Sequence, residues 1–370
     1  MAPTPLHLAD VVETFGPALR AQAGPLPAHQ HRALQAIRAC RSPALGGRRW
    51  DCPRCGHRHY VYHSCRNRHC PRCQSGARQQ WLRARLQELP AVPYYHVVFT
   101  LPAPLAAARR HDPAGLYRAL FRAASDTLTA FFRRRGLQPG MIAILHTWGQ
   151  NLHFHPHVHL LVTAGGLDRR RRWQPLGSRF LFRTQNLATV YRAKCLGALR
   201  RLKVPLPREG LPRSWHVHVQ APREDPRSLL LYLARYVTRV ALDERRLLCL
   251  DRDARTVRFR YRDYRDHARL KTLTLDGVAF LRRFLDHVLP RGFVKIRYYG
   301  LFAHGIKKRA LRRLRDALQA HAQRVSLTLW SLQALLATLA SPPPVPRFPN
   351  CRSPMILSLI LPQPSPEHPP

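Results

Sequence analysis

The segment from residue 40 to 75 carries six of the nine cysteines in the chain. Two pairs have CxxC spacing, Cys52 with Cys55 and Cys70 with Cys73. Each such knuckle lets two thiolates reach one tetrahedral ion, and a redox CxxC would not require the second pair. The spacing therefore predicts a structural Zn²⁺ site with these four cysteines as ligands. Further candidates, for a second ion or an exchanged ligand, are Cys40, Cys65, His57, His63 and His69.

Arginines beside the knuckles predict a contact with nucleic acid. Arg66 and Arg68 lie between the two knuckles, and guanidinium groups form bidentate contacts with phosphate oxygens. We therefore expect this segment to contact a nucleic-acid backbone. Cys195, Cys249 and Cys351 are scattered along the rest of the chain, and the spacing predicts no joint role for them.

Histidines alternate with other residues in HFHPHVHLLVT, residues 153 to 163. On a strand, His157 and His159 point to one face because they are two residues apart. Two imidazoles on one face can hold a divalent ion and leave coordination positions open for phosphate oxygens. A second pair, His216 and His218, lacks a comparable continuing strand. We interpret that pair as a polar face without a metal.

A third motif, LLLYLARYVTRVALDE at residues 229 to 244, predicts an amphipathic helix. Tyr232 and Tyr236 are four residues apart and share a face that is not the apolar stripe. Arg239 and Asp243 lie on the same face. Tyrosine hydroxyls can act as nucleophiles. Two amphipathic tyrosines at a domain interface would give the same pattern, and helix geometry does not separate the two interpretations.

These motifs lie on elements that mix helices and strands without strict βαβ alternation, which predicts an α+β fold. The predicted strands cover 94–101, two runs within 141–163, 217–222 and 257–263. The predicted helices cover 78–89, 105–135, 179–202, 227–241 and 276–289. We expect three consecutive domains: a helical and zinc-binding domain at 1–89, a catalytic domain at 90–305, and a basic helical and proline-rich tail, irregular at its end, at 306–370.

The charge of the chain indicates its partner. Its 370 residues include 62 Lys and Arg against 20 Asp and Glu, a formal net charge of +42. Such a charge requires a polyanion or heavy solvation, and nucleic acid is the partner we expect. The sequence has no apolar run of membrane-spanning length and no secretory signal pattern, so we expect a cytoplasmic protein, in bacteria associated with the nucleoid.

Zinc knuckles, a histidine strand and a tyrosine pair in this order resemble the transposases of the insertion sequence 91 family, which are two-tyrosine HUH enzymes of rolling-circle transposition. The resemblance covers about residues 35 to 305. The motifs that carry it include SCRNRHCPRCQ, YHVVFTLP, HTWGQNLHFHPHVHLLVTAGG, YLARYVTRVAL and FLRRFLDHVLPRGFVKIRYYG. It implies a four-cysteine zinc domain followed by an HUH-type antiparallel sheet with flanking helices.

The resemblance also implies roles for particular residues. His157 and His159 match the paired histidines that hold Mg²⁺ or Mn²⁺, and the knuckle cysteines match the family's zinc ligands. Tyr232 and Tyr236 match the nucleophiles that form a 5′-phosphotyrosine with single-stranded or hairpin DNA at the ends of a mobile element. Arg239 would then hold a neighbouring phosphate. Candidates for a third metal ligand are His96, His146, Gln150 and His153.

Two other functions fit part of this pattern. A rolling-circle replication initiator or relaxase would use the same chemistry on a plasmid origin, and a non-catalytic zinc protein would bind nucleic acid with incidental histidines and tyrosines. The N-terminal zinc domain favours the transposase. The chain departs from the family pattern near its C-terminus, where Phe348 stands at the position of the first cysteine of a CPxC-type knuckle that ends at Cys351.

Overall fold

The computed structural model describes residues 5–110, 112–177, 182–207, 209–223, 241–264, 266–322, 351 and 356–361. The chain divides into two units that are assembled from non-consecutive segments. The cysteine-rich unit comprises residues 1–77, 238–288 and 330–370, and the five-stranded unit comprises 78–237 and 289–329. The three consecutive domains expected from the sequence stay a prediction.

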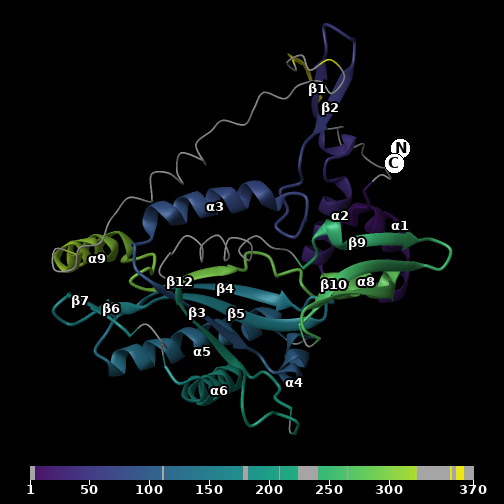
Figure 1. The fold of residues 1–370 in the computed structure, drawn as a ribbon. Helices are drawn as coiled ribbons and strands as arrows, with labels where there is room; N and C mark the ends of the chain where they lie inside the picture. The colour runs from purple at the N-terminus through teal and green to yellow at the C-terminus, as the bar shows by residue number, and fades with distance from the viewer. Residues whose placement is uncertain are drawn as a thin grey trace. The chain divides into compact units, whose positions relative to one another are not determined.

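The five-stranded unit is built on one antiparallel sheet with the strand order β12-β4-β5-β3-β8 (Figure 1). Its strands are β3 (Tyr94–Thr100), β4 (Gly140–Trp148), β5 (Phe154–Thr163), β8 (Val217–Arg223) and β12 (Ile296–Gly300). Apart from their histidines, β4 and β5 consist mainly of apolar residues, which is typical of strands buried on both faces. The sheet therefore forms a rigid base for the side chains on its strands.

One face of this sheet forms the hydrophobic core. Tyr95, Val97 and Phe99 of β3 are fully buried on that face, which is covered by helices α5 (Pro113–Arg134) and α6 (Thr184–Arg201) (Figure 1). The sequence predicts one helix over 105–135, whereas α5 begins at Pro113. Asp112 caps it there by accepting a hydrogen bond from the backbone N–H of Gly115 at 2.7 Å.

The opposite face carries polar side chains and is covered in part by α3 (Gln74–Glu88). Trp81 of α3 donates its indole N–H to the hydroxyl of Tyr298 on β12 at 3.3 Å, and Arg85 also donates to this hydroxyl. Since side chains alternate along a strand, Tyr298 and the histidines of β4 and β5 emerge on this face. Short elements complete the unit: α4 (Ala103–Ala106), η2 (Ala107–Arg110), β6 (Gly165–Leu167), β7 (Trp173–Pro175) and α9 (Lys307–Ala322).

The cysteine-rich unit contains two small antiparallel sheets. One has the order β13-β1-β2 and the other β11-β10-β9. Their strands are β1 (Gly47–Asp51), β2 (Arg58–Tyr62), β13 (Ile356–Leu361), β9 (Leu247–Asp251), β10 (Thr256–Asp263) and β11 (Arg269–Asp276). The short η1 (Pro43–Leu45) and η3 (Glu244–Arg246) precede β1 and β9.

Three helices pack in the same unit, namely α1 (Leu8–Ala23), α2 (Ala28–Ala39) and α8 (Gly277–Leu285). Helix α8 approaches α1 so closely that a Cβ atom on Gly277 would lie 2.3 Å from the ring of Phe15. Glu244 fixes the start of α1, because its carboxylate accepts from the backbone N–H of Leu8 at 3.0 Å and contacts the imidazole of His7 at 2.9 Å.

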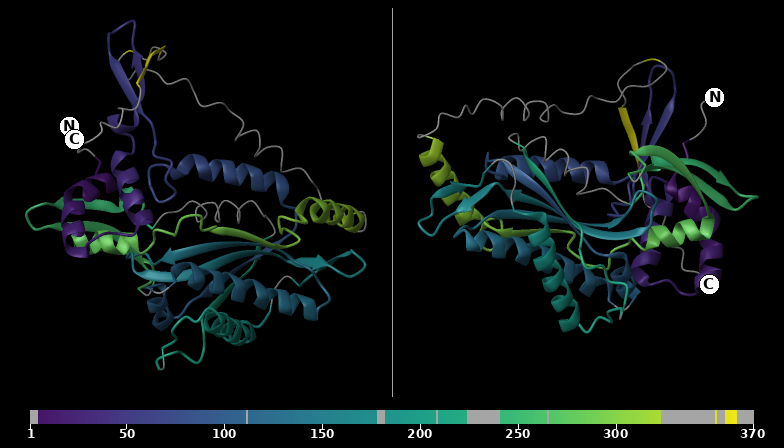
Figure 2. Two further views of the ribbon diagram at one scale, coloured as in Figure 1. Left: turned by 180° about the vertical axis from the view of Figure 1, so that it is seen from behind. Right: turned by 60° about the horizontal axis from the view of Figure 1, so that its bottom comes forward.

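The α+β fold with antiparallel sheets is confirmed. The C-terminal tail differs from the expected irregular chain, because residues 356–361 form β13 beside β1 (Figure 2). The reason is visible in the sequence ILSLIL, whose β-branched and apolar residues favour a strand. The predicted helix at 227–241 lies almost entirely outside the described residues. Across the described ranges, none of the helices combines the length and apolarity needed to cross a bilayer.

Candidate metal centres

Three histidines converge on the polar face of the five-stranded sheet. Strand register places His146 of β4 directly opposite His157 of β5, and His159 follows two residues later on the same face. The ligand nitrogens of the three residues all lie within 4.8 Å of one another. The structure therefore brings together the pair predicted from the sequence and one of the four candidates for a third ligand.

Burial determines the protonation state of two of these imidazoles. His146 is 2% exposed and His159 is 7% exposed. Burial lowers the pKa of His157 to about 4 and holds the pKa of His159 well below its usual range. Both rings are therefore neutral at pH 7, which is the form of histidine that binds a metal.

Hydrogen bonds to the other ring nitrogens fix which atom of each histidine faces the centre. His157 donates from Nδ1 to the backbone carbonyl of His155 at 2.7 Å, which leaves Nε2 as its ligand atom. His159 Nδ1 lies 2.8 Å from His96 Nε2, and His96 Nδ1 lies 3.0 Å from Gln220 Oε1. The consistent assignment has His96 donating to Gln220 and His159 donating to His96, so that Nε2 of His159 is the ligand atom.

The remaining candidates for the third ligand lie elsewhere. His96 stands behind His159, where it orients that ring. His153 lies in the turn before β5, where its ring contacts the side chain of Asn151, and neither His153 nor Gln150 belongs to the converging group. His216 and His218 are exposed. The short strand predicted at 217–222 is present as the seven-residue β8, which is shorter than the ten-residue β5.

Sequence reasoning did not find Gln220 or Lys295. Gln220 reaches His96 only because β8 pairs with β3, a contact between residues 124 apart in sequence. Lys295 precedes β12, and its Nζ lies 5.1 Å from the centroid of the Trp148 ring, which in turn stacks on His146 at 4.7 Å. A cation therefore lies near the histidines, where it can attract a phosphate.

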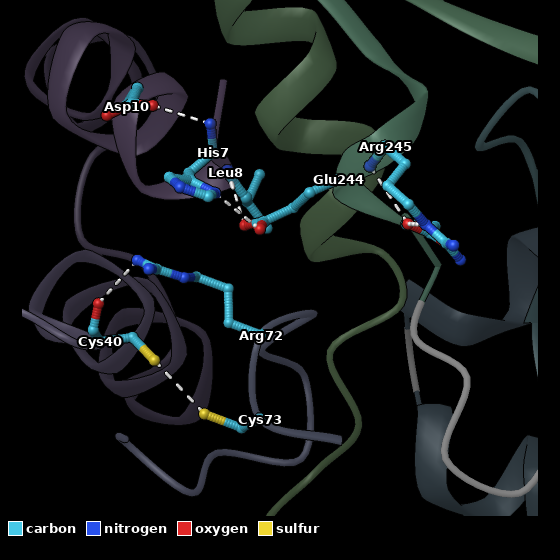
Figure 3. Close-up of polar contacts among 9 residues, drawn as sticks. His7, Leu8, Asp10, Cys40, Arg72, Cys73, Glu244 and Arg245 are labelled. Carbon is cyan, nitrogen blue, oxygen red and sulfur yellow. Dashed lines mark hydrogen bonds and ion pairs between the residues drawn. The ribbon is translucent and has the colours of Figure 1, made fainter. Parts of the chain in front are cut away.

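The cysteines form two separate groups. The first consists of Cys40, Cys65, Cys70 and Cys73, whose sulfur atoms all lie within 4.8 Å of one another. The Cys40 sulfur is 3.3 Å from that of Cys73 (Figure 3), and the Cys65 sulfur is 3.6 Å from that of Cys73. Tetrahedral zinc with Zn–S bonds of about 2.3 Å holds its sulfurs roughly 3.8 Å apart. Four thiols at this spacing fit one zinc ion.

Hydrogen bonds among these thiols shift their pKa values in opposite directions. The pKa of Cys40 falls to about 2 because the thiols of Cys65 and Cys70 donate hydrogen bonds to it, and the same contact raises the pKa of Cys65 to about 12. Thiols so close together ionise jointly only when a cation neutralises them. Arg72 supports the position of Cys40 by donating to its carbonyl at 3.1 Å (Figure 3).

The structure divides the predicted four-cysteine ligand set between the two groups. Cys70 and Cys73 join the first group, whereas Cys52 and Cys55 join Cys351 in the second. The β1–β2 hairpin is the physical reason. Each of its strands has five residues, which at about 3.3 Å per residue separates the base from the tip by roughly 17 Å. The first group lies at the base, and the knuckle Cys52–Cys55 lies at the tip.

The residues predicted to contact DNA are only partly within the described chain. Arg66 and Arg68, beside the first cysteine group, are both exposed, as a phosphate contact requires. Tyr232, Tyr236 and Arg239 lie outside the described residues, so their roles stay predictions.

Comparison with known proteins gives the family. The family model described as "Transposase zinc-binding domain" matches residues 11–101, and the one described as "Putative transposase" matches residues 140–310. The chain is 33% identical to "Transposase for insertion sequence element IS801" of Pseudomonas savastanoi pv. phaseolicola, over 76% of this chain and 72% of that protein. It belongs to the insertion sequence 91 family of transposases.

A second relative covers more of the chain. The chain is 39% identical to "Putative transposase y4qJ" of Sinorhizobium fredii (strain NBRC 101917 / NGR234), over 86% of this chain and 85% of that protein. No solved structure matches. The transposase match contains His146, His157 and His159, and the zinc-binding match contains the first cysteine group. Zinc binding by the N-terminal cysteines thus agrees with both the geometry and the family.

Proposed function

We propose that this transposase is a metal-dependent HUH-type endonuclease that nicks and rejoins single-stranded or hairpin DNA at the ends of a mobile element. The observation that carries the proposal is the convergence of His146, His157 and His159 within 4.8 Å on a rigid sheet. Three imidazoles leave coordination positions open, as a catalytic rather than a structural site does.

The ion expected in this centre is Mg²⁺ or Mn²⁺, held by Nε2 of His157, Nε2 of His159 and the imidazole of His146. When bound, it would supply Lewis-acid polarisation of a phosphate oxygen. The protein's own residues do the rest. Gln220 and His96 hold the ring of His159, and Lys295 adds positive charge where a phosphate would enter.

The nucleophile in this proposal is Tyr232 or Tyr236, the pair that resembles the tyrosines of two-tyrosine HUH enzymes. The phenol oxygen forms a bond to phosphorus while the bond from phosphorus to the 3′ oxygen breaks. The products are a 5′-phosphotyrosine and a 3′-hydroxyl, which takes up the proton that the phenol loses. Because the phosphotyrosyl bond retains the energy of the phosphodiester, rejoining needs no nucleotide cofactor. The second tyrosine is available for a second strand transfer.

Charge supports DNA as the substrate. The formal net charge is +42, and exposed Arg66 and Arg68 are suited to phosphate contacts. A reacting phosphate must enter a buried centre, which favours single-stranded or hairpin DNA over an intact duplex. The proposed activity requires access to cellular DNA, so we expect it in the bacterial cytoplasm, at the nucleoid.

Covalent trapping tests this proposal. Purified protein is mixed with labelled single-stranded DNA from the end of its element and Mg²⁺ or Mn²⁺, and the products are separated on a denaturing gel. We expect an adduct with the wild type that is lost in His157→Ala and in the double variant Tyr232→Phe/Tyr236→Phe. His218→Ala, at an exposed histidine of the same sheet, is the matched control and should retain the adduct.

The single tyrosine variants then show which hydroxyl attacks the first strand. Absence of a metal-dependent adduct in the wild type, with DNA binding intact, would refute the proposal and favour a non-catalytic zinc protein. An adduct that survives the double tyrosine substitution would refute the assignment of the nucleophiles while leaving the metal centre in place.

A further inference from the structure

The knuckle Cys52–Cys55 meets a third cysteine from the opposite end of the chain. The sulfur of Cys351 lies 3.4 Å from that of Cys52 and 3.7 Å from that of Cys55. Cys52 and Cys351 are 299 residues apart in sequence, and Cys351 lies well beyond the zinc-binding match, which ends at residue 101. The spacing of the cysteines predicted no partner for Cys351, so only the folded structure reveals this group.

Strand pairing explains how Cys351 reaches the knuckle. Strand β13 runs antiparallel to β1, with Leu361 opposite Gly47 and Ile356 opposite Asp51. Cys52 directly follows Asp51. The antiparallel register therefore places Ile356, the fifth residue after Cys351, at the end of β1 where the knuckle begins.

The distances fit metal ligands and not a disulfide. A disulfide has an S–S length of about 2.05 Å, whereas tetrahedral zinc holds its sulfurs roughly 3.8 Å apart. Both measured separations, 3.4 and 3.7 Å, are close to the second value. Thiolate ligands select soft or borderline ions, of which Zn²⁺ is the one already expected in this family.

Apolar burial contributes little to the stability of β13 on its sheet. Three of its apolar side chains bury little surface, since Leu357 is 41% exposed, Leu359 is 43% exposed and Ile360 is 65% exposed. Backbone pairing at the edge of a small sheet is marginal when so little apolar surface is covered. A metal ion bound by both the knuckle and Cys351, five residues before the start of β13, would hold the strand in register.

We propose that Cys52, Cys55 and Cys351 form a second zinc site, which fastens the C-terminal strand β13 to the cysteine-rich unit. The chain thus binds two zinc ions through cysteine, one at the base of the β1–β2 hairpin and one at its tip. The fourth position of the second ion is taken by water or a further side chain. This site is independent of the nuclease chemistry proposed above.

Counting thiolate-bound zinc tests the inference. The full chain is purified without added metal, and zinc is released by titrating its thiols with an organomercurial while a chromogenic chelator reports each ion. This readout excludes metal bound by histidine. We expect the wild type to release two ions and Cys351→Ser to release one. Cys249→Ser, at a cysteine outside both groups, should still release two.

Three further variants show which site loses its ion. Cys70→Ser should release one ion, and Cys70→Ser/Cys351→Ser should release none. Cys351→His, which restores a zinc ligand, should return the count toward two. A wild type that releases only one ion, or a folded Cys351→Ser that still releases two, would overturn the inference.

A measurement on the unaltered chain keeps the inference testable if Cys351→Ser does not fold. Metal-free wild type is titrated with Co²⁺, and the thiolate-to-cobalt absorption is followed to its end point. We expect saturation at two equivalents. Saturation at one equivalent, or a mass of the unreduced protein that shows a disulfide at Cys351, would overturn it.

Discussion

Replacing His96 with leucine should weaken metal binding without touching a metal ligand. His96 is 2% exposed and stands between Gln220 and His159, with nitrogen–oxygen and nitrogen–nitrogen separations of 3.0 and 2.8 Å. The substitution removes the acceptor that orients the His159 ring and selects its tautomer. Loss of such a supporting hydrogen bond costs about 10- to 100-fold in metal affinity, which corresponds to about 1.4–2.7 kcal/mol.

An independent physical argument gives the same range. After His96→Leu, the buried Nδ1–H of His159 loses this acceptor, and an unsatisfied buried donor costs about 1–3 kcal/mol. His96→Gln keeps a polar atom near the position of the His96 Nε2, so it should lose less affinity than His96→Leu. His218→Ala alters an exposed histidine on β8, opposite Val98 of the same sheet, and should leave the affinity within about two-fold, as expected of surface changes.

The assay is Mn²⁺ binding by calorimetry, together with the Mn²⁺ dependence of covalent adduct formation. The half-saturating Mn²⁺ concentration should rise by the predicted factor in His96→Leu, and adduct formation should recover at high Mn²⁺. Thermal unfolding of the metal-free variant controls for loss of fold. An unchanged Mn²⁺ affinity in a folded His96→Leu, or loss of the adduct that no Mn²⁺ concentration restores, would refute the positioning role.

Three further predictions follow from the described contacts. His146→Ala removes one of three converging nitrogens and should abolish measurable Mn²⁺ binding by calorimetry while Cys351-dependent zinc release is unchanged. Burial raises the pKa of Cys195 to about 12, so iodoacetamide at pH 8 should leave this thiol unmodified in the native protein and alkylate it only after unfolding, as peptide mass spectrometry can show. Gly277→Ala forces a Cβ against the ring of Phe15 and should lower unfolding stability by about 1–3 kcal/mol, measured by denaturant titration.

The sequence predicts those parts of the site that depend on local periodicity. Alternation along one strand was enough to place His157 and His159 on one face. The third histidine of the group could not be identified in this way, because His146 meets His157 only through the register of β4 on β5. The role of Gln220 is even harder to predict from the sequence, because its contact with His96 requires β8 to pair with β3. The register between two strands depends on how the whole strands pack, so residue spacing within one segment cannot predict it.

The grouping of the cysteines was also only partly predictable from the sequence. CxxC spacing identified both knuckles as metal-binding, and the family agrees for the N-terminal domain. Spacing could not determine which cysteines share an ion, because the hairpin between Cys52 and Cys65 carries the knuckles apart. It also missed Cys351, whose partners are fixed by the pairing of β13 with β1. The proline-rich composition of the tail concealed the ILSLIL segment that makes this pairing.

Burial of His157 makes the stability of the fold depend on pH. Burial lowers the pKa of His157 from 6.5 in the unfolded chain to about 4 in the folded chain. Between these two values the unfolded state binds more protons, so a fall in pH favours unfolding. The stability that neutral His157 contributes is therefore complete above pH 6.5 and is lost progressively as the pH falls toward 4. A leucine at this position would carry no such dependence. A divalent ion in the proposed site would bind the folded state alone and would offset this cost by mass action. Folding and metal binding would then reinforce each other on this face of the sheet.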